Sequence, residues 1–411
     1  MYQIVAGLTK EEVVQQKNTY GYLRGQAQQV GVWDAASKKF VPCNWLPTMN
    51  APVYLERKAA YEPHADAVGH FPASDFQTRI KSVSDLVTHN TAILGILGIG
   101  KSMLAIELLE RMMAEGIKVI CLDLTSQYAR ELSDFYDAAY EDECLTKIQE
   151  AAAKDREEIA NDPEEGGSIA NLREALRRDV AQFLDSANPR LLKIYSPSSF
   201  FATKQQREPS TYKDGSEWRT RAGLYTVTPV EITQIISEAA LAVLSEEMST
   251  KARACLVYEE AHSLVPEWNS VVNEGDKLAT SGTARAILQG RKHGLGCLLI
   301  TQRTANVTKT ILNQCNSVFA MRTFDETGKE FLANYIGRDY ADSLSSLSER
   351  HAVFFGKASS CENPVLIRLN DQDDFRKAFR AAHPPPKIPE SADASKSQVA
   401  TEAEFNDDIP F

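Results

Sequence analysis

The chain has 411 residues, of which 43% are hydrophobic and 25% are charged, and its formal net charge at pH 7 is −11. This composition is ordinary for a soluble globular protein with a large core. The acidic balance argues against a protein that coats nucleic acid with a basic surface, but a ring that grips DNA in its channel needs only a few basic residues per subunit.

Cysteine usage and hydropathy indicate where the protein works. The seven cysteines show no C-x-x-C pairing, and four of them lie in apolar or strand-like runs, as reduced packing cysteines do. No N-terminal segment combines basic residues with an apolar run, and no run approaches the roughly 18 apolar residues of a membrane span. We therefore expect a cytoplasmic protein that is neither secreted nor inserted into a membrane.

The first 85 residues contain short β-like runs separated by Gly, Pro and Asn, including Gln29–Trp33 and Pro52–Leu55. This pattern predicts a small β-rich N-terminal domain over residues 1–85, and the alternative is an irregular N-terminal arm. From Ser84 onward strands and helices alternate, which predicts an α/β domain with a parallel sheet over residues 86–382.

The first strand of that domain leads into a phosphate-binding motif. Residues 91–102 begin as an apolar strand and then match the pattern G-x-x-x-x-G-K-[ST], with Gly95, Gly98, Gly100, Lys101 and Ser102 in the loop. Helical spacing follows from roughly Lys101 to Ala114. A chance match in a glycine-bearing turn is the alternative, and the strand before the motif and the helix after it speak against that reading.

Each residue type in this loop has a chemical reason to be there. The glycines let backbone N–H groups converge on phosphate oxygens, and the positive end of the following helix points at the same place. Lys101 would neutralise the β- and γ-phosphates, and Ser102 would ligate Mg²⁺. The sequence therefore predicts a site for ATP and Mg²⁺.

The next segments extend the sheet and insert helices. Residues 117–123 form a second apolar strand that ends in Asp123, at the position where open α/β sheets make ligand contacts. Residues 126–187 are rich in Glu, Ala, Leu and Lys, which predicts a helical insertion with solvated charged faces, broken near Asn161–Pro163 and Gly166–Gly167. Leu191–Tyr195 resembles another strand.

A basic segment follows, which we interpret as a loop over residues 204–223. Its cations alternate with aromatic residues and could contact a nucleic-acid backbone and bases. They are Lys204, Arg207, Lys213, Arg219 and Arg221, among Tyr212 and Trp218. Three acids dilute the charge, so an ordinary solvated loop remains the alternative. Thr228 and Pro229 then predict an N-cap and the first residue of a helix that extends to Met248.

The strand at residues 253–258 ends in two carboxylates, Glu259 and Glu260. This pattern is typical of a Walker B segment, in which one acid holds a Mg²⁺-bound water and the next activates the attacking water. The alternative for two acids after a strand is a solvated cap. We expect His262 to pack or form a hydrogen bond beside the acids.

Four further strands complete the predicted sheet. A strand at residues 296–300 ends in Thr301, Gln302 and Arg303, and an amide at this edge can sense the γ-phosphate or orient a water. Residues 316–321 supply a fifth core strand. Residues 351–356 and 364–369 predict a closing β pair.

Taken together, these motifs resemble the HerA branch of the HerA/FtsK ATPases over about residues 85–370. The motifs are Gly-Ile-Leu-Gly-Ile-Gly-Lys-Ser, Val-Tyr-Glu-Glu-Ala-His, Gly-Arg-Lys-His-Gly-Leu-Gly and Thr-Gln-Arg. The resemblance implies a RecA-like P-loop ATPase core, a parallel sheet with helices on both faces. It also implies a hexameric ring that moves double-stranded DNA with ATP, commonly beside a nuclease or other effector subunit in DNA processing or antiviral defence.

The resemblance also implies roles for individual residues. Glu260 would be the catalytic base, Gln302 the sensor, and Arg291 an arginine finger that reaches a neighbour's nucleotide. Asp123 begins a segment that looks like the family's acid-x-x-Gly-Glu-Tyr, from which Ser126 and Gln127 depart. Glu259 stands where the family more often has Asp, which bears on metal geometry and turnover.

Two other functions remain open at this point. Related conjugation and secretion ATPases share this core, although a membrane-docked enzyme fits poorly with the absence of an apolar span. A nucleotide-dependent ring scaffold that regulates an effector and hardly hydrolyses ATP belongs to a different class.

The last 29 residues, 383–411, are rich in Pro, Ser, Ala and acids, which predicts a disordered acidic tail. The tail ends in Asp-Asp-Ile-Pro-Phe, residues 407–411, and this ending looks like the acidic tip of bacterial single-stranded-DNA-binding protein. The tip could dock onto enzymes that read that peptide, because Phe411 can fill an apolar pocket and the aspartates can meet a basic rim. The alternative is an acidic tail that only aids solubility.

Overall fold

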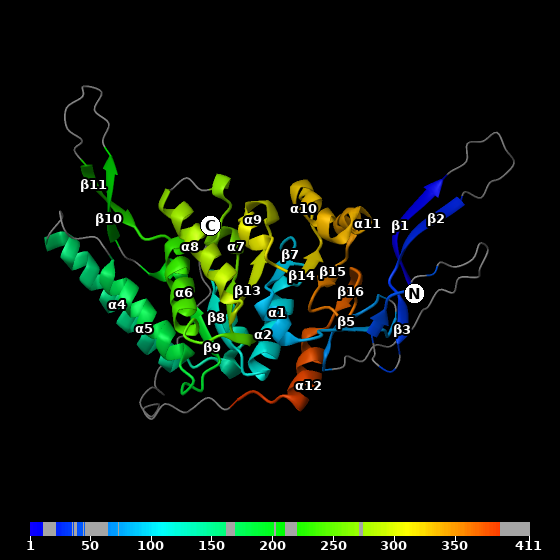
Figure 1. Ribbon diagram of the computed structural model, residues 1–411, viewed down its shortest axis with the longest axis horizontal. Coiled ribbons are helices and arrows are strands. Elements are labelled where there is room, and N and C mark those ends of the chain that lie inside the picture. The colour runs from blue at the N-terminus through cyan, green and yellow to red at the C-terminus, as the bar shows by residue number, and fades with distance from the viewer. Residues whose placement is uncertain are drawn as a thin grey trace, which may run out of the picture.

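The computed structural model describes residues 1–10, 22–34, 36, 39–43, 45, 65–72, 74–161, 169–200, 203–209, 220–270 and 274–386. The centre of the structure is a ten-stranded sheet with the strand order β6-β5-β16-β15-β14-β7-β13-β12-β8-β9 (Figure 1). Helices cover both faces of this sheet. The predicted α/β fold class, a P-loop core with a parallel sheet between helices, is therefore confirmed.

Six neighbouring strands run parallel and form the part of the sheet that holds the motifs. They are β14 (Ser317–Met321), β7 (Thr91–Leu94), β13 (His293–Thr301), β12 (Ser249–Tyr258), β8 (Lys118–Leu122) and β9 (Leu192–Tyr195). Since β13 lies between β7 and β12, the ends of the three motif-bearing strands are neighbours at one edge of the sheet.

Four antiparallel strands extend the sheet beyond β14. They are β15 (His351–Gly356), β16 (Val365–Leu369), β5 (Ala67–His70) and β6 (Gln77–Arg79). The closing β pair predicted at residues 351–356 and 364–369 is present as β15 and β16. The sheet also crosses the predicted domain limit at residue 85, because β5 and β6 belong to it; that limit stays a prediction.

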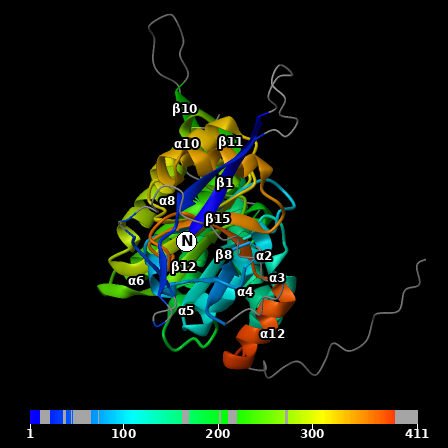
Figure 2. The same ribbon diagram turned by 90° about the vertical axis from the view of Figure 1, so that its right-hand side faces the viewer.

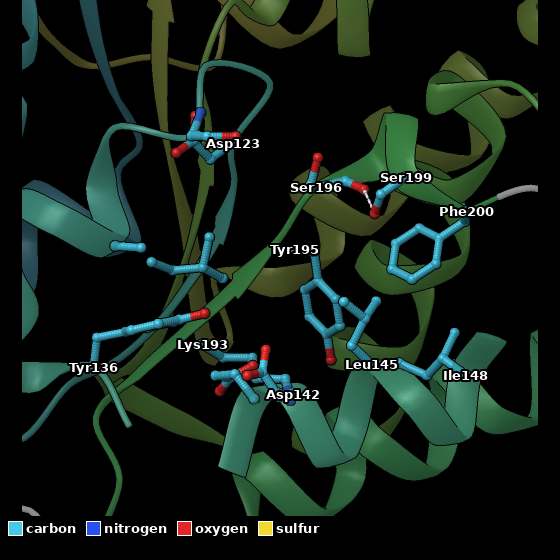
Figure 3. Close-up of a pocket in the computed structure, with 14 residues that line it drawn as sticks. Asp123, Tyr136, Asp142, Leu145, Ile148, Lys193, Tyr195, Ser196, Ser199 and Phe200 are labelled. Atoms are coloured by element: carbon cyan, nitrogen blue, oxygen red, sulfur yellow. Dashed lines mark hydrogen bonds and ion pairs between the residues drawn. The ribbon is translucent and has the colours of Figure 1, made fainter. Parts of the chain in front are cut away.

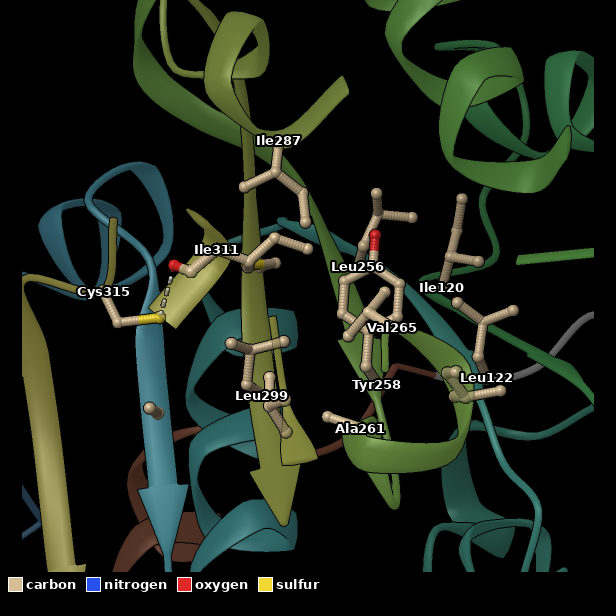
Figure 4. Packing of buried hydrophobic residues seen from close by; sticks show 14 of the residues in the cluster. Ile120, Leu122, Leu256, Tyr258, Ala261, Val265, Ile287, Leu299, Ile311 and Cys315 are labelled. Carbon is tan, nitrogen blue, oxygen red and sulfur yellow. Dashed lines mark hydrogen bonds between the residues drawn. The ribbon is translucent and has the colours of Figure 1, made fainter. Parts of the chain in front are cut away.

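Alternation along the buried strands explains why helices are needed on both faces. In β12, Leu256 and Tyr258 join one hydrophobic cluster, whereas Cys255 and Val257 join the other. Figure 4 shows the first cluster, in which Leu256 and Tyr258 lie among residues from neighbouring strands and helices. A strand with apolar side chains on both sides is stable only when both faces are covered.

The helices that cover the two faces can be followed in Figure 2, with α6 and α8 on one side and α2, α3 and α12 on the other. The helices of the main domain are α1 (Val83–Thr88), α2 (Lys101–Ala114), α3 (Tyr128–Glu131), α6 (Pro229–Leu244), α7 (Ala261–Leu264), α8 (Glu274–Gly290), α9 (Lys309–Leu312), α10 (Glu326–Ile336), α11 (Arg338–Ser343) and α12 (Gln372–Ala382). Helix α6 begins as predicted, because Thr228 accepts from the Glu231 amide in a capping box, but it ends at Leu244 rather than Met248.

The predicted helical insertion is a pair of helices, α4 (Ala138–Asn161) and α5 (Ala170–Leu184), at the left of Figure 1. Asp155 of α4 accepts hydrogen bonds from the amides of Asn171 and Leu172, which are among the orphan donors of the first turn of α5. The pair is fixed to the sheet by a buried ammonium, since Lys193 of β9 lies 3.0 Å from carboxylate oxygens of both Glu141 and Asp179.

The segment interpreted above as a loop over residues 204–223 is instead a β-hairpin. Strands β10 (Thr203–Pro209) and β11 (Thr220–Thr226) pair antiparallel from Thr203 with Thr226 to Pro209 with Thr220. The loop interpretation was wrong because the many charged residues give these segments little strand propensity of their own. The strands form because the two segments pair with each other. Residues 210–219 lie outside the described part of the chain.

The N-terminal residues form two small antiparallel pairs, β1 (Tyr2–Lys10) with β2 (Tyr22–Gln29) and β3 (Val32–Asp34) with β4 (Lys39–Val41). The run predicted at residues 52–55 lies outside the described residues. Gln3 ties this region to the large sheet: its side-chain amide donates to the Leu366 carbonyl at 2.5 Å and accepts from the Leu366 amide at 2.7 Å.

Helix α12 fastens the end of the described chain to the helix after the phosphate loop. Arg376 and Arg380 both pair with Glu110 of α2, whose side chain is 1% exposed, at 3.0 and 2.8 Å. Residues 387–411, with the predicted acidic tail and its tip, lie outside the described residues. Among the helices of the described residues, none has both the length and the apolar character needed to cross a bilayer.

Candidate nucleotide site

The loop between β7 and α2 has the backbone conformations that a phosphate cradle needs. Gly98 and Gly100 have φ values of 77° and 97°, which side-chain-bearing residues rarely adopt. At Gly95 an added Cβ would lie 2.5 Å from Cδ1 of Ile99 and 2.8 Å from Cβ of Met321. Turn geometry and close packing therefore explain the glycines of this motif.

Lys101, at the first turn of α2, folds back over the loop. Its Nζ donates to the Ile96 carbonyl at 2.8 Å, and the residue is 7% exposed. Burial lowers the pKa of this ammonium, while the nearby charges of Glu260 and Glu259 act in the opposite direction. Ser102 follows on the same turn and is half-buried. A cation and a hydroxyl thus lie at the loop, as predicted.

Glu259 is buried at the end of β12, where it has one strong partner. The Tyr128 hydroxyl donates to its Oε2 at 2.5 Å, and Glu259 is 3% exposed. Burial raises the pKa of Glu259 to about 7; the hydrogen bond from Tyr128 opposes this, and the charges of Glu260 and Asp123 add to it. This carboxyl is held in place by Tyr128, and the nearby charge of Lys101 also acts to lower its pKa.

Glu260 and Gln302 meet at the ends of β12 and β13. The Gln302 side-chain amide donates to Oε1 of Glu260 at 3.3 Å, and Nδ1 of His262 lies 3.2 Å from Oε2 of the same carboxyl. His262 also lies 3.3 Å from the Thr301 hydroxyl, so it sits beside the acids as expected. Glu260 itself has φ 54°, an uncommon conformation for a residue with a side chain and one often found at functional sites.

Asp123 directly follows β8 and lies close to Glu259, but its carboxylate oxygens accept hydrogen bonds from residues of its own loop. They accept from the amides of Thr125, Ser126 and Tyr128 and from the Thr125 hydroxyl, at 2.7 to 3.2 Å. Ser126 has φ 58°, which explains why glycine suits this position in the related motif. Asp123 thus shapes the turn that brings Tyr128 to Glu259, and its predicted contact with the nucleotide stays a prediction.

Arg291 lies far from this group within the chain. It precedes β13, at the amino ends of the parallel strands, whereas the phosphate loop lies at their carboxyl ends. Arg291 is exposed and lines a cavity of about 250 Å³ with His89 and Asn90. The structure therefore brings together Lys101, Glu259, Glu260 and Gln302, and leaves Arg291 at the opposite edge of the sheet.

The residues at the carboxyl edge fit a nucleotide with a divalent cation. Burial raises the pKa of Glu259, the nearby charges of Glu260 and Asp123 add to the rise, and a bound cation would relieve it. The loop amides and Lys101 provide the complementary anion site. Ser102 and Glu259 would be the residues that hold Mg²⁺, directly or through water.

A separate cavity of about 160 Å³ opens beside Asp123, between β9 and α4 (Figure 3). Its wall carries Lys193 and Tyr195, and Tyr195 donates to Asp179 at 2.5 Å. Burial raises the pKa of Glu141 to about 7, against the attraction of Lys193. The Lys193 ammonium in the wall of this cavity thus pairs with two buried acids, Glu141 and Asp179.

Two arginines next to the phosphate loop were not singled out from the sequence. The Arg322 carbonyl accepts from the Ile96 amide at 2.9 Å, and the Arg350 amide donates to the Ile99 carbonyl at 3.1 Å. Neither residue belongs to a recognisable motif. The only available signal was position: Arg322 directly follows β14, the neighbour of β7, and Arg350 directly precedes β15, the neighbour of β14.

Comparison with known proteins supports the resemblance for part of the chain. Residues 66–199 match the family described as Helicase HerA, central domain. The DNA double-strand break repair helicase HerA of Pyrococcus furiosus is 26% identical over 124 residues, which are 29% of this chain and 21% of that protein. The protein of the same description from Saccharolobus solfataricus is 28% identical over 129 residues, which are 31% and 24% of the two chains.

These findings support a HerA/FtsK-type ATPase, while the chain spans only about a fifth to a quarter of the length of these relatives. Among solved structures, VirB4 of Thermoanaerobacter pseudethanolicus covers 76% of this chain and 98% of its own, at 12% identity and a TM-score of 0.42.

Proposed function

We propose that this protein is an ATPase of the HerA type that works as a ring and moves double-stranded DNA. The observation that carries the proposal is the meeting of Lys101, Glu260 and Gln302 at the carboxyl ends of β7, β12 and β13, with the Gln302 amide 3.3 Å from Glu260. A phosphate cradle, a carboxylate and an orienting amide are the parts that hydrolysis of a terminal phosphate requires.

Each of these residues would have its own role in ATP binding and hydrolysis. Lys101 leaves the Ile96 carbonyl and pairs with phosphate oxygens, while the amides at the start of α2 bind the rest of the anion. Glu260 accepts the proton of the attacking water, and Gln302 holds the water or the γ-phosphate in place. Mg²⁺ would neutralise phosphate charge when bound. Tyr128 holds the Glu259 carboxyl in place, and this carboxyl would help to hold the metal.

The placement of Arg291 favours an assembly of several subunits. An arginine at the amino edge of the sheet cannot reach the phosphate loop of its own chain, but it can act on a nucleotide held by a neighbour. We therefore propose a closed ring, with a hexamer as the expected form, in which Arg291 acts in trans.

The DNA substrate and the partner are inferred from the relatives and from the sequence motifs. Two of the relatives are described as DNA double-strand break repair helicases. The nuclease or other effector subunit is proposed from the resemblance of the sequence motifs alone. The C-terminal tip, which lies outside the described residues, would add a docking peptide for enzymes that read single-stranded-DNA-binding protein. We propose a role in DNA processing or antiviral defence, as the resemblance of the motifs implies.

The decisive experiment compares ATP hydrolysis by the wild type, Lys101→Ala and Glu260→Gln, with and without duplex DNA. Lys101→Ala should lose productive ATP binding, whereas Glu260→Gln should bind ATP and stall. Hydrolysis stimulated by DNA supports a motor. Tight binding with negligible turnover in the wild type would instead support the ring scaffold, and equal rates for the wild type and Glu260→Gln would refute the site.

A further inference from the structure

Arg350 occupies a strained position against the phosphate loop. Its φ is 59°, a left-handed conformation that costs a residue with a side chain about 1–2 kcal/mol. The strain is held by two backbone hydrogen bonds, from the Arg350 amide to Ile99 at 3.1 Å and from the Leu369 amide to the Arg350 carbonyl at 2.8 Å. Such strain is often kept where a side chain must be aimed at a ligand.

The Arg350 side chain runs alongside the loop. Its Cγ lies 3.2 Å from the place that a Cβ on Gly100 would occupy, so the arginine packs directly against the residue before Lys101. One guanidinium nitrogen pairs with Asp371, the N-cap of α12, at 2.5 Å. Its Nε is buried and has no hydrogen-bond partner among the described residues. A buried donor without a partner is costly unless a ligand satisfies it.

A second arginine is joined to this loop through its backbone. The Arg322 carbonyl accepts from the Ile96 amide, and the Arg322 Nε is also buried without a partner among the described residues. Phosphate oxygens are the natural acceptors for two guanidinium groups beside a phosphate loop.

The order of the strands decides which part of the nucleotide Arg350 faces. Glu260 and Gln302 follow β12 and β13 on one side of β7, whereas Arg350 immediately precedes β15 on the other side, beyond β14. The attacking water and the leaving group lie roughly in line in phosphoryl transfer, with the water on the side of its base. The side opposite Glu260 therefore faces the diphosphate that leaves.

We propose that Arg350 binds the α- and β-phosphates of the nucleotide held by its own subunit. Asp371 is a positioning residue that keeps the guanidinium turned toward the loop. This inference rests on the proposed ATPase function. It gives the site a cation from its own chain that binds the nucleotide before and after hydrolysis, distinct from the role of Arg291 on a neighbour's nucleotide.

The test measures the affinity of the full-length protein for fluorescent ATP and ADP analogues. Arg350→Gln should weaken both by a similar factor of about ten, the effect of losing a hydrogen-bonded charge, because both nucleotides carry the diphosphate. Arg368→Ala, which removes an exposed arginine from β16 next to Arg350, is the matched control and should change neither affinity. Thermal melting of Arg350→Gln checks that it folds.

Asp371→Asn separates phosphate binding from simple anchoring of α12. It breaks the ion pair but keeps both guanidinium groups, so affinity should fall by no more than about threefold. An equal loss in Asp371→Asn and Arg350→Gln, a loss for ATP alone, or unchanged affinity in a folded Arg350→Gln protein would overturn the inference and leave the ATPase proposal standing. Failure of the wild type to bind either nucleotide would overturn both.

Discussion

The Tyr128 hydroxyl donates a 2.5 Å hydrogen bond to the Glu259 carboxyl and so joins the loop after β8 to the end of β12. The two residues are 131 positions apart, and both are almost completely buried. The Asp123 turn that positions Tyr128 and the acid pair that ends β12 thus form one unit. This unit orients a carboxyl whose pKa is raised by burial and by the nearby charges of Glu260 and Asp123.

Removing this hydroxyl tests whether the orientation of Glu259 matters for turnover. We expect Tyr128→Phe to lower the rate of ATP hydrolysis at saturating ATP about tenfold, since a hydrogen bond to a charged group is typically worth about 1.5–3 kcal/mol. The Mg²⁺ concentration needed for half the maximal rate should rise, and nucleotide affinity should change little. Steady-state ATPase assays across a Mg²⁺ titration measure both. Tyr136→Phe, a nearby half-buried tyrosine, is the control. Unchanged kinetics in Tyr128→Phe would show that Glu259 needs no support.

The position of Arg291 leads to a prediction about mixed rings. Arg291→Ala should lose hydrolysis but keep nucleotide affinity and assembly, because its own phosphate loop is untouched. Mixing inactive Arg291→Ala subunits with inactive Lys101→Ala subunits should restore part of the activity, since some interfaces then combine an intact loop with an intact arginine. Mixtures that never regain activity would rule out action in trans. Lys292→Ala, an exposed neighbour, is the control.

The buried cluster around Lys193 predicts how stability changes with pH. Burial raises the pKa of Glu141 from its ordinary value of 4.5 to about 7, so between these values the folded state binds more protons than the unfolded state. The contribution of this group to the free energy of unfolding therefore falls as pH rises from about 4.5 to 7. Glu141→Gln should flatten the fall in melting temperature over this range.

Melting curves recorded at closely spaced pH values provide the measurement. Asp142→Asn removes the adjacent carboxylate, which is exposed, and should leave the slope as in the wild type. A Glu141→Gln protein with the slope of the wild type would mean that another group controls this pH range.

The β10–β11 hairpin is the expected DNA contact. Replacing Arg219 and Arg221 by Ala should weaken duplex DNA binding. The slope of the logarithm of the binding constant against the logarithm of the salt concentration should become shallower by about 1 to 2, because fewer counterions are released. Binding measured at several salt concentrations gives the slope. Arg177 and Arg178, two exposed arginines of α5, are the matched control pair. If the slope is unchanged, DNA contacts another surface.

The sequence was most informative where signals were local. Strand β7 begins at Thr91 and helix α2 spans Lys101–Ala114, as predicted, because apolar runs, glycines and helical spacing lie within a few residues of each other. The start of α6 followed from Thr228 and Pro229 for the same reason. The acid pair after β12 was predictable because the strand and the carboxylates are adjacent in sequence.

Features that depend on distant partners could not be predicted in this way. The β10–β11 hairpin needs pairing across an intervening segment, and its charged residues read as a loop. The bond between Tyr128 and Glu259 and the packing of Arg350 against Gly100 join segments that only the folded sheet brings together. The strand β12 likewise begins at Ser249 rather than Arg253, because Ser249 pairs with His293 of β13 although the first residues of the strand are partly exposed.

The two hydrogen bonds between Gln3 and Leu366 have a consequence for shortened forms of the protein. Strand β5 pairs with β16 at only two residue pairs. Next to these pairs, the Gln3 side chain forms hydrogen bonds with the Leu366 amide and carbonyl, as a backbone strand would. Deleting the N-terminal segment would expose peptide groups that can pair with the same edge of another molecule. Oligomers formed by such a protein would be joined through sheet edges, and their size in sedimentation experiments would reveal nothing about a ring built around nucleotide.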